Sequence, residues 1–222
     1  MLSLDSIAQQ TYRPLEVVIV DDGSGESDSI KNKELRIKEV LKNIPVILYR
    51  QENQGAPVAR NKGCTLSQGE YVLFWDADII GEPFMIERMY TALQKNSFAS
   101  FAYSNFYFHG HQMRAQEFDF ESLKKVNYIT TMSLVRRKDF VGFDPALKRF
   151  QDWDLWLTMA ERGKKGIWID EYLYGSVPTK NGMSEWLPSF AYKAPWKYLP
   201  FFSSRVKKYE EAKKIILKKH GL

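Results

Sequence analysis

The stretch EYVLFWDAD, from Glu70 to Asp78, joins an apolar run to two aspartates, Asp76 and Asp78. An apolar run of this length is typical of a buried strand. Side chains alternate along an extended chain, so both aspartates are expected on one side where the strand ends. Paired carboxylates suit Mg²⁺ or Mn²⁺, ions that usually bind substrate phosphates as well as the protein. An aspartate-rich turn is the alternative.

Strand-like and helical segments alternate on both sides of this stretch. We expect strands at 15–20, 45–49, 70–75, 101–108, 129–135 and 167–169, and helices at 27–41, 56–66, 83–95, 150–162 and 205–220. This alternation predicts an α/β fold with a mostly parallel central sheet flanked by helices. In such sheets, ligands bind beyond the carboxyl ends of the strands.

Composition indicates a soluble globular protein of 222 residues, large enough for one domain with an appendage. No apolar run approaches the roughly 20 residues of a membrane span. The single cysteine, Cys64, excludes an internal disulfide and fits a reducing compartment, so a cytoplasmic location is expected. We expect Cys64 to be a small, half-buried helix residue and not a nucleophile.

The net charge of +5 comes entirely from residues 203–222, which carry seven Lys or Arg and two Glu. The rest of the chain is balanced, which argues against nucleic acid as a partner. The basic helix expected at 205–220 either packs on the domain with one face in solvent or touches anionic lipid at the periphery of a membrane.

Two loops carry polar groups suited to a nucleotide. Asp21 and Asp22 follow the strand at 15–20 in the pattern VDDGS, where a carboxylate can accept from a base or a ribose hydroxyl. In the pattern ENQGAPVARNKG, Gly55 allows the chain to bend and Arg60 can face a phosphate from the start of a helix. The alternatives are an ordinary Asp-Gly turn and a surface ion pair for Arg60.

The pattern FQDWDLW, at 150–156, opens a helix with two carboxylates. Asp152 fits either the helix N-cap or a general base held at the helix start, and Asp154 suits the first turn. Trp153 and Trp156 would wall the site and raise the carboxyl pKa by burial, or they would pack in the core. Core packing is the favoured interpretation for Trp156.

Taken in order, these patterns resemble the inverting family 2 glycosyltransferases with the Rossmann-like GT-A fold of nucleotide-diphospho-sugar transferases. The resemblance runs from about Leu4 to Ser184. It implies a hexosyltransferase-type enzyme that uses Mg²⁺ or Mn²⁺ to move a sugar from a nucleotide diphosphate to an acceptor hydroxyl, with inversion, in glycan or polysaccharide biosynthesis. It divides the chain into a glycosyltransferase domain at 1–185 and an aromatic, proline-containing segment with the basic helix at 186–222.

The same resemblance implies a role for each site residue. Asp21 or Asp22 would hold the base and ribose of a UDP- or dTDP-sugar, and Arg60 would face the donor. Asp76 and Asp78 would contact the ribose and a divalent cation on the diphosphate. Asp152 would be the catalytic base, acting on a glycan or a lipid-linked acceptor.

The chain departs from the family pattern in ways that leave two other functions open. The family opens with a strand ahead of its first helix, and this chain opens inside that helix, so we expect the first strand of the sheet to be missing. Gln151 replaces the usual Glu, and Lys180 would have to substitute for absent basic residues at 174–177. A truncated domain that binds a nucleotide or a partner without catalysis is the alternative. A nucleotidyltransferase is disfavoured because the loop at 23–26 is acidic.

Overall fold

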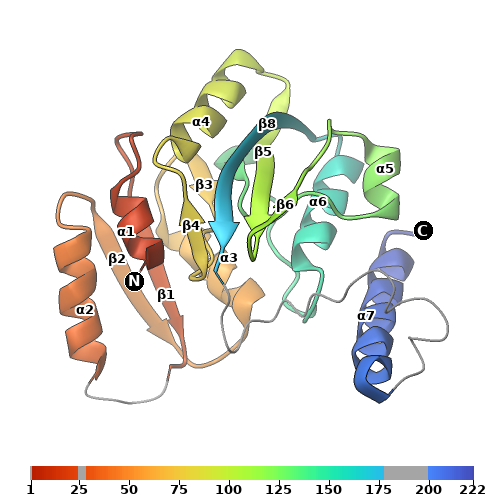
Figure 1. Ribbon diagram of the computed structural model, residues 1–222, viewed down its shortest axis with the longest axis horizontal. Coiled ribbons are helices and arrows are strands. Elements are labelled where there is room, and N and C mark those ends of the chain that lie inside the picture. The colour runs from red at the N-terminus through yellow and green to blue at the C-terminus, as the bar shows by residue number, and fades with distance from the viewer. Residues whose placement is uncertain (1, 25–28, 178–199) are drawn as a thin grey trace.

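Helices flank two β-sheets in the computed structural model, which describes residues 2–24, 29–177 and 200–222 (Figure 1). The first half contains α1 (Leu2–Ala8), β1 (Val17–Asp22), α2 (Ser29–Val40), β2 (Val46–Gln51), α3 (Ala56–Leu66), β3 (Tyr71–Leu73), β4 (Ile79–Gly81) and α4 (Met85–Lys95). The second half contains β5 (Ala99–Phe108), β6 (His111–Met113), α5 (Phe120–Lys125), β7 (Leu134–Arg136), a 3₁₀ turn (Arg137–Asp139), α6 (Gln151–Glu161), β8 (Lys165–Ser176) and α7 (Pro200–Lys219).

The strands form two separate sheets where the sequence predicts one. β1 and β2 pair in parallel, from Val17 opposite Val46 to Asp22 opposite Gln51. The other sheet has the order β3-β7-β5-β8-β4, with β6 added to β5. Among the described residues β1 pairs only with β2, and every residue of β1 is only partly buried. An apolar strand of this kind is normally covered on both faces.

The larger sheet is mixed, which corrects the prediction of a mostly parallel sheet. Only β5 and β8 run parallel in it, whereas the β3–β7, β5–β7, β4–β8 and β5–β6 pairs are antiparallel. The β5–β6 pair is a hairpin that turns at His109 and Gly110, both with positive φ. Only antiparallel neighbours can be joined by so short a connection, because parallel strands need a crossover.

The core lies on both faces of the larger sheet. On one face, α6 buries Trp153, Trp156 and Leu157 against Phe101 of β5. On the other face, α4 buries three side chains, Met85, Met89 and Leu93, in a second cluster with residues of β5, β7 and β8. Helix α6 is therefore an interior element, and its amino end is placed by the core.

The structure differs from the predicted elements in β8, which is longer than the strand expected at 167–169, and between α5 and β7. The predicted strand at 129–135 is reduced to β7, and residues 126–133 form an irregular segment. Within it, Thr130 accepts from the Met132 N–H through its hydroxyl, and Asn127 accepts from the Ile129 N–H through its amide oxygen. Short polar side chains that bond nearby backbone compete with a strand ladder in this way.

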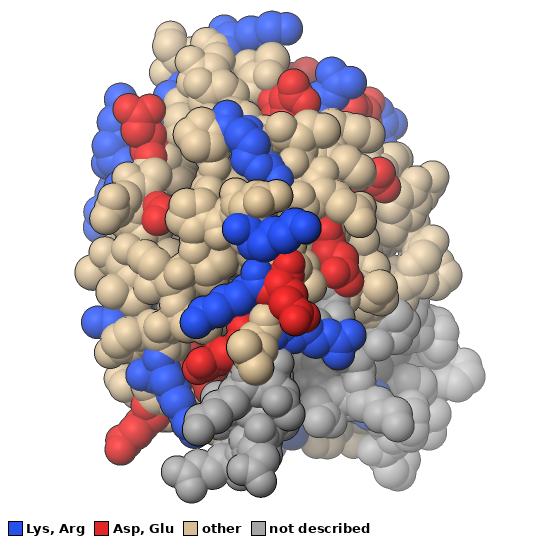
Figure 2. Space-filling view, turned by 90° about the vertical axis from the view of Figure 1, so that its left-hand side faces the viewer, with Lys and Arg blue, Asp and Glu red and all other residues tan. Residues whose placement is uncertain are grey.

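On the face shown in Figure 2, acidic and basic side chains are interspersed. This agrees with the balanced charge outside residues 203–222. In the part of the chain that the structure describes, no helix combines the length and apolarity needed to cross a bilayer. The predicted domain boundary near residue 186 and the side chain of Lys180 lie outside the described residues.

Candidate active site

Asp22 ties the end of β1 to the loop that leads into α3. One carboxylate oxygen accepts from the Gln51 side-chain amide at 2.8 Å and from the Gln54 N–H at 2.9 Å. The other accepts from the Gly55 N–H at 2.8 Å. Burial raises the pKa of the Asp22 carboxyl, but these three hydrogen bonds outweigh it and leave the pKa below its usual value. Both oxygens of Asp22 are thus used to brace the loop.

The neighbouring turn depends on a glycine, as the VDDGS pattern predicts. Asp21 accepts from the Ser24 N–H at 2.9 Å and lies 3.7 Å from the Arg50 guanidinium. Gly23 has φ of +81°, and a Cβ at that position would lie 2.8 Å from the Asn53 nitrogen. Only glycine combines this backbone conformation with so close an approach. The turn brings the two aspartates to the carboxyl end of β1.

Arg60 links two of the predicted site segments. It projects from the second turn of α3, with its side chain only 16% exposed. One terminal nitrogen donates to the Asp76 carboxylate at 2.7 Å, and the other donates to the Gln151 side-chain oxygen at 2.8 Å. The planar guanidinium is suited to such a two-sided bond. It joins the end of β3 to the first residue of α6.

The two aspartates after β3 have different surroundings. The second oxygen of Asp76 accepts from the Thr131 hydroxyl at 3.0 Å, so both of its oxygens have partners. Asp78 is partly buried, and its side chain has no hydrogen bond or ion pair to any residue the structure describes. No group of three or more metal-ligating side chains occurs among those residues either. Asp78 is therefore the carboxylate better placed to accept a ligand.

Asp152 is the second residue of α6 and is partly buried. Its carboxylate accepts from the Asn127 amide at 2.9 Å and from the Trp153 N–H at 2.9 Å. Burial raises the pKa of the Asp152 carboxyl, and these hydrogen bonds together with the charge of Arg60 only partly offset it. A carboxyl with a raised pKa is closer to the range useful for proton transfer near neutral pH.

Two expectations about this helix start are corrected. The N-cap is Phe150, in the left-handed region with φ of +56°, and not Asp152. Trp153 and Trp156 both lie in the core, with exposed fractions of 2% and 0%, so Trp153 does not wall the site. Their indole nitrogens donate to the carbonyls of Leu123 and Ile129, which satisfies them internally.

Three residues at this site were not predicted from the sequence: Asn127, Thr131 and Tyr174. Thr131 lies in the segment predicted as a strand and Asn127 lies two residues before it, and neither a hydroxyl nor an amide carries a signal of its own there. The Tyr174 hydroxyl bonds that of Thr130. Burial raises the pKa of Tyr174 above its usual range, the Thr130 bond lowers it, and the charges of Asp76 and Asp152 raise it further. Tyr174 is therefore close enough to Asp76 and Asp152 for both charges to affect its pKa.

The structure brings most of the predicted site residues together near the carboxyl ends of β1 and β3. Arg60, Asp76 and Gln151 are in direct contact, and Asp152 follows Gln151 in the same helical turn. Asp21 and Asp22 reach this group indirectly, through the loop that Asp22 holds at the start of α3. The arrangement offers a partly buried carboxyl of raised pKa beside a carboxylate–guanidinium pair.

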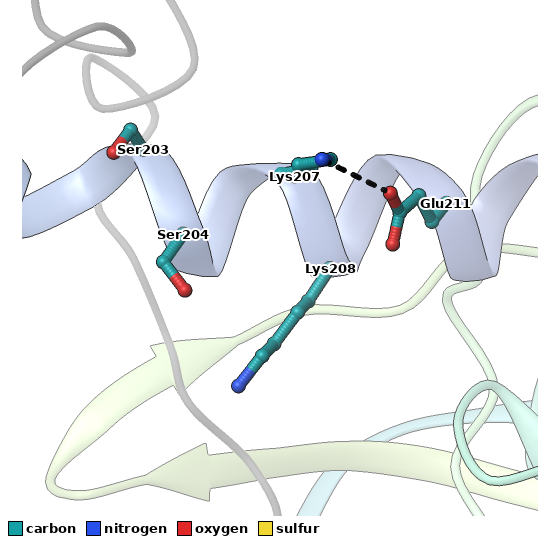
Figure 3. A pocket seen from close by; sticks show the side chains of 5 residues that line it. All are labelled: Ser203, Ser204, Lys207, Lys208 and Glu211. Atoms are coloured by element: carbon teal, nitrogen blue, oxygen red, sulfur yellow. Dashed lines mark ion pairs between the residues drawn. The ribbon is translucent and has the colours of Figure 1, made fainter.

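Other features contribute nothing to this site. Cys64 is a partly buried residue of α3, as predicted, and burial raises the pKa of its thiol despite the charge of Arg137. An open hollow on α7 (Figure 3) lies away from the predicted site residues, none of which lines it. Its lining consists of Ser203, Ser204, Lys207, Lys208 and Glu211.

Residues 2–143 match the family model described as glycosyl transferase family 2. An uncharacterized glycosyltransferase of Haemophilus influenzae is 30% identical over 173 residues, covering 71% of this chain and 56% of that protein. The putative teichuronic acid biosynthesis glycosyltransferase TuaG of Bacillus subtilis is 25% identical, covering 93% of this chain and 90% of that protein. The chain thus spans little more than half of the first relative and most of the second.

Solved structures show the same fold. TarS 1-349 of S. aureus in complex with UDP-GlcNAc has a TM-score of 0.65 at 18% identity, covering 81% of this chain and 54% of that one. The mannosyltransferase PcManGT of Pyrobaculum calidifontis, in complex with GDP-Man and Mn²⁺, has a TM-score of 0.61 at 20% identity, covering 80% and 53%. The predicted GT-A fold is confirmed, and by its sequence this chain belongs to glycosyl transferase family 2.

Proposed function

We propose that this protein transfers a sugar from a nucleotide-diphosphate donor to an acceptor hydroxyl with inversion. The observation that carries the proposal is the bridge from Asp76 through Arg60 to Gln151, which places Asp152 in the helical turn beside the paired carboxylate. A transferase of this kind needs a base for the acceptor close to polar groups for the donor, and the contacts among Asp76, Arg60 and Gln151 support these roles.

Asp152 is the proposed catalytic base. An acceptor hydroxyl is a weak nucleophile near neutral pH, so a carboxylate that removes its proton during attack accelerates the reaction. The raised pKa strengthens Asp152 as a proton acceptor, and the Asn127 amide fixes its direction. Attack from the side opposite the diphosphate inverts the anomeric carbon.

The proposed donor site lies at the strand ends. Asp21 and Asp22 would meet the base and ribose, and Arg60, Asp76 and Asp78 would lie along the ribose and diphosphate. Relatives in fold were solved with UDP-GlcNAc and with GDP-Man, which supports a nucleotide-sugar donor. The first agrees with the UDP- or dTDP-sugar expected from the family, whereas the second carries another base.

The residues fit a divalent cation in part. The Asp78 carboxylate has no partner among the described residues, whereas each oxygen of Asp76 already accepts a hydrogen bond, from Arg60 or from Thr131. We therefore propose Asp78 as the main ligand for Mg²⁺ or Mn²⁺ and Asp76 as an auxiliary one. When bound there, the cation would neutralise charge on the leaving diphosphate. The Mn²⁺ complex of a fold relative supports this proposal.

For the acceptor we propose a glycan or a lipid-linked saccharide handled in the cytoplasm, because the relative TuaG is named for teichuronic acid biosynthesis. Peripheral membrane contact through α7 has weaker support. Val206 and Ile216 of this helix are buried, and Ile216 belongs to the core cluster that contains Trp153 and Trp156, as the packed alternative predicts. Among the side chains of α7 that the structure describes, Ile215 is the exposed large apolar one. Sedimentation with anionic liposomes, with and without residues 203–222, tests the contact.

The test is turnover of a panel of nucleotide sugars to free nucleoside diphosphate. We expect turnover by the unaltered protein and its loss in Asp152→Asn and Asp76→Ala, with Glu39→Gln on α2 as an exposed control. Retention of full activity in both site variants would refute the proposal.

The non-catalytic alternative is favoured by one observation. Asp21 and Asp22 lie on a two-stranded sheet that is separate from the sheet containing β3, the strand that precedes Asp76. A domain divided in this way can bind a nucleotide without aligning it for attack. Calorimetry that shows nucleoside-diphosphate binding, with no transfer to any acceptor extract, would establish this alternative.

A further inference from the structure

Helix α7 lies along α6 and runs in the same direction. Tyr209 packs edge-on against Phe150 with ring centroids 5.1 Å apart, and the Lys213 ammonium lies 5.9 Å from the Trp153 ring. Further along, His220 meets Glu161. These contacts follow the same order along both helices, so the carboxyl end of α7 lies beside the body of α6.

The end of α7 closes on α6 through five charged or titratable side chains, which we call the Asp154 cluster. Its members are Asp144, Asp154, Glu161, Lys219 and His220. The Lys219 ammonium lies 2.6 Å from Asp144 and 2.7 Å from Asp154. The two ring nitrogens of His220 lie 3.0 Å from Asp154 and 2.7 Å from Glu161.

Burial makes these contacts important for α6. The side chain of Asp154 is 3% exposed and that of His220 is 2% exposed. A buried carboxylate is costly unless it is paired, and removing one partner of such a pair leaves an uncompensated charge. The only hydrogen-bonding side chains shown at Asp154 within the described residues are Lys219 and His220, both at the end of α7.

The cluster acts on the helical turn that also serves the active site. Asp154 stands two residues after Asp152, and its N–H donates to the Phe150 carbonyl at 3.0 Å in the first turn of α6. Three residues before Asp154, on the same side of the helix, Gln151 accepts a hydrogen bond from Arg60 of α3. The first turn of α6 is therefore held by side chains from both α3 and the end of α7.

We propose that Lys219 and His220 are positioning residues, which hold Asp154 and so keep Asp152 in place for proton transfer. The inference rests on the proposed role of Asp152 as the base. It assigns to the end of the chain a task in catalysis, although neither residue lies near the strand ends where the donor is proposed to bind.

The test compares Lys219→Met, Lys219→Arg and His220→Gln in the full chain, with Lys218→Met as a control at the exposed neighbouring position. We expect kcat to fall at least about tenfold in Lys219→Met and His220→Gln, because a displacement of about 1 Å can cost on the order of 100-fold. The donor KM should stay within about twofold, since donor contacts are unchanged. Lys219→Arg should recover kcat, and amide exchange at residues 150–154 should be faster only in the two impaired variants.

Thermal melting identifies any variant that fails to fold. If Lys219→Met does not fold, the test rests on comparing kcat and amide exchange in His220→Gln with those in Lys219→Arg. Wild-type kcat together with wild-type exchange in folded variants would overturn the inference. If the unaltered protein transfers no sugar from any donor, the proposed function fails by itself. The positioning of the turn is then judged by amide exchange, and unchanged exchange in His220→Gln rejects it.

Discussion

The Arg60 guanidinium donates to the Asp76 carboxylate at 2.7 Å while its other terminal nitrogen is bonded to α6. This ion pair is partly buried, which sets it apart from an exposed surface pair of little value. It makes the position of α6, which carries the proposed base, depend on the segment after β3 that carries the proposed donor ligands. Changes at either residue are therefore expected to affect both chemistry and donor binding.

Arg60→Lys should impair the enzyme although it keeps the charge. An ammonium group cannot span Asp76 and Gln151 as the planar guanidinium does. We expect kcat to fall by about 10- to 100-fold and stability to fall by about 1–2 kcal/mol. Steady-state kinetics and urea unfolding measure the two effects, with Arg36→Lys on the exposed face of α2 as the control. Unchanged kinetics would mean that the bridge is not needed.

The rate of transfer should rise with pH through the ionisation of Asp152. The base must be ionised to accept a proton, and burial raises its pKa above the ordinary value of 3.8. The acid limb of the kcat profile is thus expected at a midpoint above that value. A profile between pH 4 and 9 tests this, and a limb at or below the ordinary value would contradict the assignment.

Gln151→Glu should move that limb further up. A second carboxylate next to Asp152 disfavours its ionised form and raises its pKa. The new carboxylate also gives Arg60 a charged partner in place of a neutral amide, so folding should not be lost. An unmoved limb, measured under the same conditions, would show that Arg60 screens the new charge completely, and a shift to lower pH would contradict the prediction.

Asp22 should make stability depend on pH in the acid range. Its pKa is lowered in the folded state, so its contribution is present above the unfolded-state pKa of about 4 and is lost as the pH falls through the folded-state value. Urea unfolding at pH 7 and pH 3 should show a smaller difference for Asp22→Asn than for the unaltered protein. Asp5→Asn on α1 is the control. An equal difference in all three proteins would show that Asp22 does not contribute to the pH dependence of stability.

Gly23→Ala should weaken nucleotide binding by moving the loop ahead of α3. The substitution combines an unfavourable φ of +81° with a Cβ 2.8 Å from the Asn53 nitrogen. The cost is expected to be on the order of 1–3 kcal/mol. Urea unfolding and calorimetry with UDP measure the two effects. Gly110→Ala, which shares the positive φ but has nothing within 4 Å of the added Cβ, separates strain from collision.

The sequence was sufficient for the family, the GT-A fold and the turn at the end of β1, because each is carried by a local pattern. Asp22 and Gly23 form the predicted turn, and Arg60 lies on the predicted helix. Pairing across the chain was not predictable in this way. The bridge from Arg60 to Gln151 joins residues 91 positions apart, and a hydrophobic period contains no information about such a contact.

The polar segment at 126–133 and the mixed sheet escaped prediction for related reasons. A β-branched run such as Ile129-Thr130-Thr131 favours a strand locally, and only the bonds of Thr130 and Asn127 to nearby backbone show why it is irregular. Strand direction depends on which strands become neighbours. The length of β8 was missed because its pairing with β5 shifts register next to Ser104 and Asn105, where regular alternation is broken.

The division of the sheet has a consequence for the behaviour of the protein at high concentration. β1 is an apolar strand, partly buried along its whole length, with β2 as its single strand partner in the described structure. A strand that pairs along only one edge can act as a template for pairing with another molecule, and Val17 to Val20 supply no charge to prevent it. Self-association through this strand is expected to increase with concentration, and a lysine introduced at Val18 should suppress it.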